Sequence, residues 1–160
     1  MIEFNEIYKA NNELDDMFIK KYDHVDLVRK NKIELLVEIG ELANETKCFK
    51  YWSSKKADMS LVEMEYADCV IMTLCFFNLL KIKLDDQFPE ITDNLDDISI
   101  FAKIYSLASN FYYQEDASII KELFVYLLKL GYHLGFNNDD IKRICMKKIN
   151  CDKERLRKDY

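Results

Sequence analysis

Apolar residues recur at steps of three and four positions through almost the whole of this 160-residue chain. That spacing lines one face of an α-helix, and no convincing stretch alternates at the period of two that a half-buried strand requires. Only three glycines and one proline interrupt the pattern, so few tight turns are expected. The pattern predicts an all-α bundle of about five or six helices. They are expected near residues 2–20, 25–47, 60–83, 97–112, 117–133 and 138–158.

The length suits one domain with a substantial core, since a chain of about this size buries roughly 70% of its unfolded surface. No internal repeat of fixed period and no linker divides the sequence, so a single domain spanning residues 1–160 is predicted. Two polar segments, 47–59 and 85–97, are expected to be loops. Asn138 or Asp139 is expected to cap the last helix.

The net charge of −6 is unevenly distributed. Residues 141–160 hold eight Lys or Arg against three Asp or Glu, a balance of +5, so the rest of the chain carries −11. An acidic body with a basic tail suits a protein that holds a metal ion and a polyanion side by side, rather than a general nucleic-acid binder. Binding of DNA through the tail is a minor alternative, and it predicts an affinity that falls steeply with salt.

The five cysteines form no Cys-x-x-Cys pair and are odd in number, which is typical of reduced thiols in a cytoplasmic protein. The acidic N-terminus is unlike a signal or transit peptide. The longest uncharged run, residues 69–80, has 12 residues, whereas roughly 20 are needed to span a bilayer. A cytoplasmic protein with no membrane partner is therefore expected.

Four glutamates stand at helical spacing in the segment KIELLVEIGELANE: Glu34, Glu38, Glu41 and Glu45. At about 100° per residue they cover a wedge of roughly 60° on a helix that is otherwise mostly apolar. No basic residue occurs between positions 33 and 46. Carboxylates aligned on a largely buried helix repel one another and lose hydration, so they need a neutralising partner. The expected partner is a cation.

Glu65 and Asp68 repeat this arrangement on the next predicted helix. Their i, i+3 spacing puts both on one face. Two antiparallel helices would bring this pair together with Glu38 and Glu41 around one pocket. Such a set of hard oxygen ligands suits Mg²⁺ or Mn²⁺ rather than zinc or copper, and magnesium held by carboxylates is the usual partner of substrate phosphates.

Two other interpretations of these acids fit the sequence less well. Solvated helix faces often carry Glu at such spacing, but the missing basic partners and the matched second pair disfavour that explanation. A di-iron bundle needs Glu-x-x-His on two helices. The only histidines, His24 and His133, stand in no such motif.

Basic and aromatic residues are interleaved in the loop KCFKYWSSKK. Lys50 and Lys55 are suited to attract phosphate while Trp52 stacks on a base, unless the aromatics simply pack under the bundle. In the tail, Lys148 and Arg155 are seven residues apart and therefore share a helix face, which is either a phosphate site or a solvated basic surface.

In this order the motifs resemble the dimeric, all-α dUTPase family, within the wider MazG-like nucleoside triphosphate pyrophosphatases. The central block LLVEIGELANETKCFKYWSSK, followed by EYADCV, is similar to the family's metal-binding ExxE, lysine–aromatic loop and ExxD. IYKANNELDD resembles its opening segment, and KKINCDKERLRKDY its closing Lys…Arg…Tyr motif. The resemblance spans Ile7 to Tyr160, with a poorly matched middle.

The resemblance implies a homodimer that hydrolyses dUTP to dUMP and pyrophosphate with Mg²⁺, for which Mn²⁺ is a substitute. It implies Glu38, Glu41, Glu65 and Asp68 as metal ligands, with Glu41, or otherwise Glu38, acting on the attacking water. The implied substrate-binding residues are Asn12, Lys50, Trp52, Lys55, Lys148, Asp152, Arg155 and Tyr160.

The two outer glutamates of the acidic segment have lesser expected roles. Glu45 is expected to lie behind the ligands and orient a nearby lysine. Glu34 is expected to be merely exposed.

Departures from the family pattern concentrate where base or sugar would bind: Asn12 for Gln, Ile71 for His, Asp152 for Asn and Leu156 for Gln. An ionised Asp offers only acceptors, so Asp152 would favour an amino-bearing base such as cytosine if it reached the base. It can equally pair with Arg155. The predicted substrate is dUTP, and the alternatives are dCTP or a broad nucleotide range. An inactive helical interaction module is disfavoured by the intact carboxylates.

Overall fold

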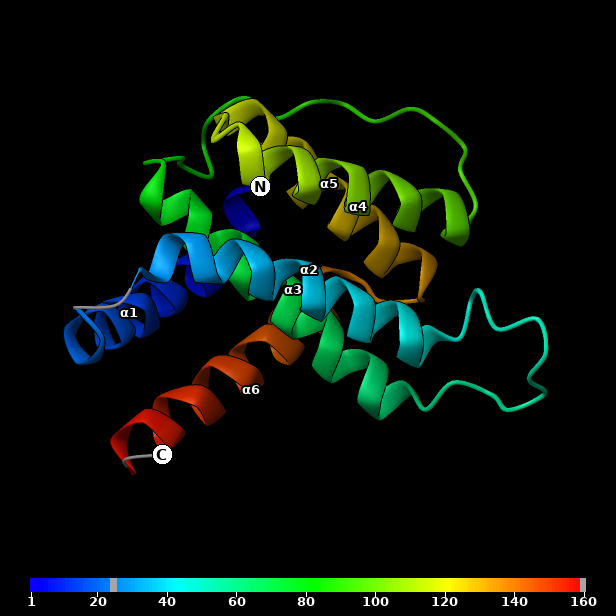
Figure 1. Ribbon diagram of the computed structural model, residues 1–160, viewed down its shortest axis with the longest axis horizontal. Coiled ribbons are helices and arrows are strands. Elements are labelled where there is room, and N and C mark those ends of the chain that lie inside the picture. The colour runs from blue at the N-terminus through cyan, green and yellow to red at the C-terminus, as the bar shows by residue number, and fades with distance from the viewer. Residues whose placement is uncertain (24–25, 159–160) are drawn as a thin grey trace.

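The computed structural model describes residues 1–23 and 26–158, and within these ranges it contains helices and no strand (Figure 1). The prediction of an all-α bundle is confirmed. The elements are a 3-10 turn at Ile2–Phe4 and helices α1 (Asn5–Lys21), α2 (Leu27–Thr46), α3 (Met59–Leu79), α4 (Asp97–Tyr113), α5 (Ala117–His133) and α6 (Asn138–Arg157).

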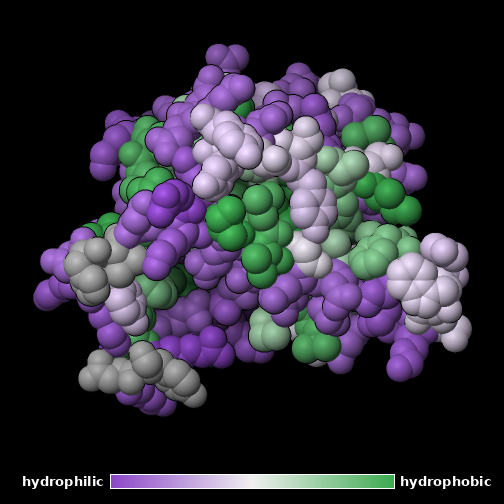
Figure 2. All heavy atoms as spheres, viewed as in Figure 1, coloured by the Kyte–Doolittle hydropathy of each residue, from purple (hydrophilic) through white to green (hydrophobic). Residues whose placement is uncertain are grey.

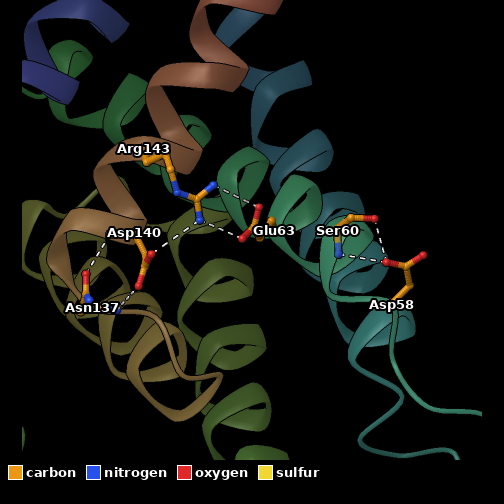
Figure 3. Close-up of polar contacts among 6 residues, drawn as sticks. All are labelled: Asp58, Ser60, Glu63, Asn137, Asp140 and Arg143. Carbon is orange, nitrogen blue, oxygen red and sulfur yellow. Dashed lines mark hydrogen bonds and ion pairs between the residues drawn. The ribbon is translucent and has the colours of Figure 1, made fainter.

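Short acidic or amide side chains begin the helices from α2 to α6. Each of these helices has an Asp or Asn N-cap whose side chain accepts a backbone N–H of the first turn. At α6 the cap is Asn137, and Asp140 completes a capping box with it (Figure 3). The expectation of a cap at Asn138 or Asp139 was wrong by one or two positions, because both residues already lie inside the helix.

Helix α3 ends four residues before the predicted end at position 83. Lys81 adopts a left-handed conformation (φ 58°), and the Ile82 amide donates to the Phe77 carbonyl at 2.8 Å, closing the helix end. Ile82 and Leu84 then turn back into the core, where both are buried. Their apolar character extended the helical pattern in the sequence although the chain had already changed direction.

All six helices contribute side chains to one hydrophobic cluster. In Figure 1, α2 and α3 cross the centre, α4 and α5 cover one side, and α1 and α6 lie toward the other. Tyr66 is fully buried on α3 and donates its hydroxyl to the Leu127 carbonyl on α5 at 3.1 Å. A Cβ atom at Gly131 would lie 2.3 Å from the Tyr66 hydroxyl oxygen, so this close approach requires glycine.

Ion pairs tie α6 to its neighbours. Arg143 reaches Glu63 on α3 at 2.9 Å and Asp140 on its own helix at 3.6 Å (Figure 3). Lys153 reaches Glu13 on α1 at 2.7 Å. These exposed pairs add little free energy individually. They flank the stretch of α6 that packs against α1 and α3.

All five cysteines are free, as predicted, and Cys69 and Cys145 are fully buried. None of the helices in the described ranges is long and apolar enough to cross a bilayer.

Candidate active site

Helices α2 and α3 pack against each other and bring the two acidic pairs together. Carboxylate oxygens of Glu38, Glu65 and Asp68 lie within 4.8 Å of one another. Glu41 adjoins this group, since its carboxyl shares a hydrogen bond with that of Glu65. The four residues predicted as metal ligands therefore form one cluster, in which Glu41 is the most exposed member.

Burial and mutual repulsion dominate the electrostatics of this cluster. Burial, followed by the negative charges of Asp68 and Glu41, raises the pKa of Glu38 to about 7. Burial and the charge of Glu41 also raise the pKa of Glu65. The pKa of Asp68 is raised by burial, which a hydrogen bond from Lys148 only partly offsets. A raised pKa means that the charged form of the carboxyl group is disfavoured, and a bound cation would stabilise that form. The hard oxygens of these groups suit Mg²⁺ or Mn²⁺.

Helix α6 places two basic side chains and one further acid beside the cluster. Lys148 Nζ lies 2.9 Å from Asp68 Oδ1 and 3.6 Å from Asp152 Oδ1. Arg155 also reaches Asp152, at 3.5 Å. Asp152 therefore pairs with both Lys148 and Arg155. This pairing is the alternative, given in the sequence analysis, to a hydrogen bond between Asp152 and the base. Lys148 and Arg155 supply positive charge next to the acids, where phosphate groups bound to a metal would lie.

A cavity of about 450 Å³ opens between α1, α2, α3 and α6. One end is charged and includes Glu38, Asp68 and Lys148. The other end is walled mainly by apolar side chains: Phe18, Ile19, Leu27, Val28 and Leu79. A cavity with phosphate-binding chemistry at one end and apolar walls at the other has the form expected for a nucleotide.

Two buried polar residues of α1, Asn11 and Asp15, line the same cavity and were missed by the sequence analysis. Asn11 donates to the Ile71 carbonyl at 3.1 Å and to Asp15 Oδ2 at 3.4 Å. Burial raises the pKa of Asp15 to about 7, against the opposing effect of hydrogen bonds with Cys75 and Asn78. The available signal was their position on the apolar face of α1, where a polar residue needs a reason to be buried.

Comparison with known families identifies the class of the protein. A family model described as dUTPase matches residues 3–160, nearly the whole chain. The chain belongs to the all-α dUTPase family. The protein is thus a dUTP diphosphatase, an enzyme that hydrolyses a nucleoside triphosphate to its monophosphate and pyrophosphate. The sequence matches no curated protein.

Several residues predicted to bind the dUTPase substrate lie away from the cavity. Asn11, not its neighbour Asn12, lines the cavity, because adjacent helical residues point about 100° apart. The Asn12 Oδ1 atom is buried, and no hydrogen-bond partner for it lies in the described ranges.

The loop between α2 and α3 extends beyond the C-terminal end of α2 (Figure 1). The apolar part of the cavity is lined by residues at the opposite, N-terminal end of this helix. Its residues Lys50, Trp52 and Lys55 do not line the cavity. Trp52 is 65% exposed and packs edge-on against Phe49 and Tyr51. The loop therefore makes an aromatic cluster of its own.

The remaining predicted positions fall in three places. Glu45 accepts from Asn44 Nδ2 at 3.4 Å, and within the described ranges no lysine pairs with it. Tyr160 lies outside the described residues. Ile71 and Leu156, both named as departures from the family pattern, line the cavity with Glu34.

Proposed function

We propose that this dUTP diphosphatase binds its substrate in the cavity between α1, α2, α3 and α6, with the triphosphate at the charged end and the base at the apolar end. The observation that carries the proposal is the convergence of four carboxylates from two helices beside Lys148 and Arg155. Dissociable carboxyl groups beside cationic side chains suit a reaction that depends on positioning and electrostatic stabilisation.

In the proposed mechanism Glu38, Glu65 and Asp68 hold Mg²⁺, with Mn²⁺ as a substitute, and Glu41 completes the set. The bound ion would neutralise charge on the phosphate oxygens. Glu41 would orient the attacking water and accept its proton, a role that suits the most exposed acid of the cluster. Glu38 is the second candidate for that role.

Lys148 and Arg155 would bind the phosphate oxygens and stabilise the pyrophosphate that leaves. One water is consumed, the bond between the α- and β-phosphates breaks, and dUMP and pyrophosphate form. Asp152 would hold both cations in position through its ion pairs. The resemblance also implies substrate-binding roles for four residues that do not line the cavity, so their position does not support those roles: Asn12, Lys50, Trp52 and Lys55.

The base would lie among the apolar side chains with its polar edge toward Asn11 and Asp15. An ionised Asp15 would accept a hydrogen bond from the N3–H group of uracil, but it would also accept one from the amino group of cytosine. For this reason dCTP is the competing substrate that the experiment has to include.

We further propose that residues 1–160 form one catalytic domain, that the enzyme acts in the cytoplasm, and that it is a homodimer. Exposed apolar side chains support the dimer: Ile33 and Val37 on α2 are each 50% exposed, and hydrophobic atoms gather over the centre of the molecule in Figure 2. Static light scattering of the purified protein tests the dimer, and a monomeric mass at micromolar concentration would overturn it.

The deciding experiment is pyrophosphate release from dUTP, dCTP, dTTP, dATP, dGTP and the ribonucleotides, each with and without Mg²⁺. We expect hydrolysis of dUTP that depends on the ion and exceeds that of every other nucleotide. Preferential hydrolysis of dCTP would contradict the proposed reading of the base, and hydrolysis without any divalent ion would contradict the proposed metal site.

A further inference from the structure

Glu34 is exposed, as the sequence suggested, but it also lines the cavity. The charged groups that act on its carboxyl group are Asp68, Lys148 and Asp152. Unlike Asp68 and Asp152, it takes part in no ion pair or hydrogen bond within the described ranges. A carboxylate that lines a ligand cavity without a partner of its own is available to accept a hydrogen bond from the ligand.

The position of Glu34 along α2 indicates which part of the ligand it meets. It lies one turn, about 6 Å, from Glu38 at the charged end. In the other direction, Asn31 follows after about one more turn, and Leu27 stands in the apolar wall. In a deoxynucleotide the sugar joins the phosphates to the base, so a ligand that spans the cavity brings its sugar to the level of Glu34.

We propose that Glu34 accepts the hydrogen bond of the deoxyribose 3′-hydroxyl and thereby makes this enzyme selective for substrates that carry that group. The proposal rests on the orientation given under the proposed function. The 3′-hydroxyl is the only free hydroxyl of the sugar in dUTP, and it is a donor that a carboxylate receives well. Asp152 on α6 is less suited, because Lys148 and Arg155 already engage its carboxylate.

The test compares dUTP with 2′,3′-dideoxyuridine triphosphate, which lacks only the 3′-hydroxyl. A hydrogen bond to a charged group predicts that wild-type kcat/KM is about tenfold or more higher for dUTP. Glu34→Ala should remove this preference by lowering the value for dUTP and leaving the dideoxy value unchanged or raised. Glu34→Gln should keep part of the preference, because its amide oxygen still accepts. Glu154→Ala, at an exposed acid outside the cavity, is the matched control and should behave as wild type.

Calorimetric titration with dUMP and 2′,3′-dideoxyuridine monophosphate, without divalent ions, gives a readout independent of turnover and should show the same pattern in Kd. A preference that survives intact in Glu34→Ala would overturn the assignment, as would a wild-type enzyme that hydrolyses dUTP and its dideoxy analogue equally well. Wild-type protein that neither binds dUMP nor hydrolyses dUTP would overturn both this inference and the proposed function. The two failures are therefore distinguishable.

Discussion

Glu38 and Asp15 line the same cavity, and burial raises the pKa of both carboxyl groups to about 7. The neighbours differ. Around Glu38, four other carboxyl groups add to the effect of burial. Around Asp15, hydrogen bonds from Cys75 and Asn78 oppose it, and within the described ranges no cation pairs with it. The Glu38 end of the cavity therefore concentrates negative charge, which a bound cation would neutralise. The Asp15 end has a single acid, which suits a contact with the uncharged base.

The largest expected effect is on turnover at the charged end. Glu41→Gln removes the proposed base and should lower kcat by about 10²- to 10⁴-fold while the fold survives, because the side chain is exposed. Steady-state pyrophosphate release and circular dichroism measure the two quantities. Glu63→Gln, on α3 but turned toward Arg143, is the control and should keep full turnover. An active Glu41→Gln enzyme would exclude Glu41 as the base.

The next largest expected effect is on the free energy of unfolding, and it arises from Asp15 at the apolar end of the cavity. The pKa of Asp15 is raised from 3.8 to about 7 in the folded protein. Between these values the folded state holds a proton that the unfolded state has lost, so this residue lowers stability as pH rises through that window. Relative to wild type, Asp15→Asn should gain on the order of a few kcal/mol in unfolding free energy between pH 5 and pH 8.

Urea unfolding at the two pH values measures this difference. The control is Asp16→Asn, which changes the exposed neighbour and should show no such gain. Equal differences from wild type at pH 5 and pH 8 for Asp15→Asn would show that the carboxyl group titrates normally.

The smallest effect separates the two acids directly. Metal binding requires deprotonated ligands, so Mg²⁺ affinity should fall as pH drops below about 7, by up to about tenfold per unit for each proton displaced. Asp15→Asn should leave this pH dependence unchanged, whereas Glu38→Gln should abolish most of it along with tight binding. Calorimetry at pH 6, 7 and 8 gives the affinities. A slope that vanished in Asp15→Asn would mean that the two ends are electrostatically coupled.

The charged end could be predicted from sequence because its signal is local. Spacing alone puts Glu38 and Glu41 on one face of a helix, and the absence of basic neighbours marks them as unusual. The length of the connecting segment is compatible with the pairing to Glu65 and Asp68. Helix positions followed from the same periodicity, and the error at the end of α3 arose where Ile82 and Leu84 continued the apolar pattern past a left-handed residue.

The other end could not be predicted, because it depends on how distant helices pack. Asn11 and Asp15 become cavity residues only when α1 meets α3, and the Asn11 side chain is satisfied by the Ile71 carbonyl, 60 positions away. Motif comparison selected Asn12, which lies on a different side of α1. Likewise, the contact of Lys148 with Asp68 depends on the packing of α6 against α3, which spacing does not encode.

The central claim is that the carboxylates of α2 and α3 form a divalent-metal site. Anomalous diffraction from crystals grown with Mn²⁺ tests it most directly. We predict anomalous peaks among the carboxylates of Glu38, Glu65 and Asp68, with Glu41 at the edge of the site, and their loss in Glu38→Gln crystals. If the enzyme hydrolyses dUTP with Mn²⁺ but its crystals show no peak in this cluster, or show peaks only elsewhere in the molecule, the result would contradict the account.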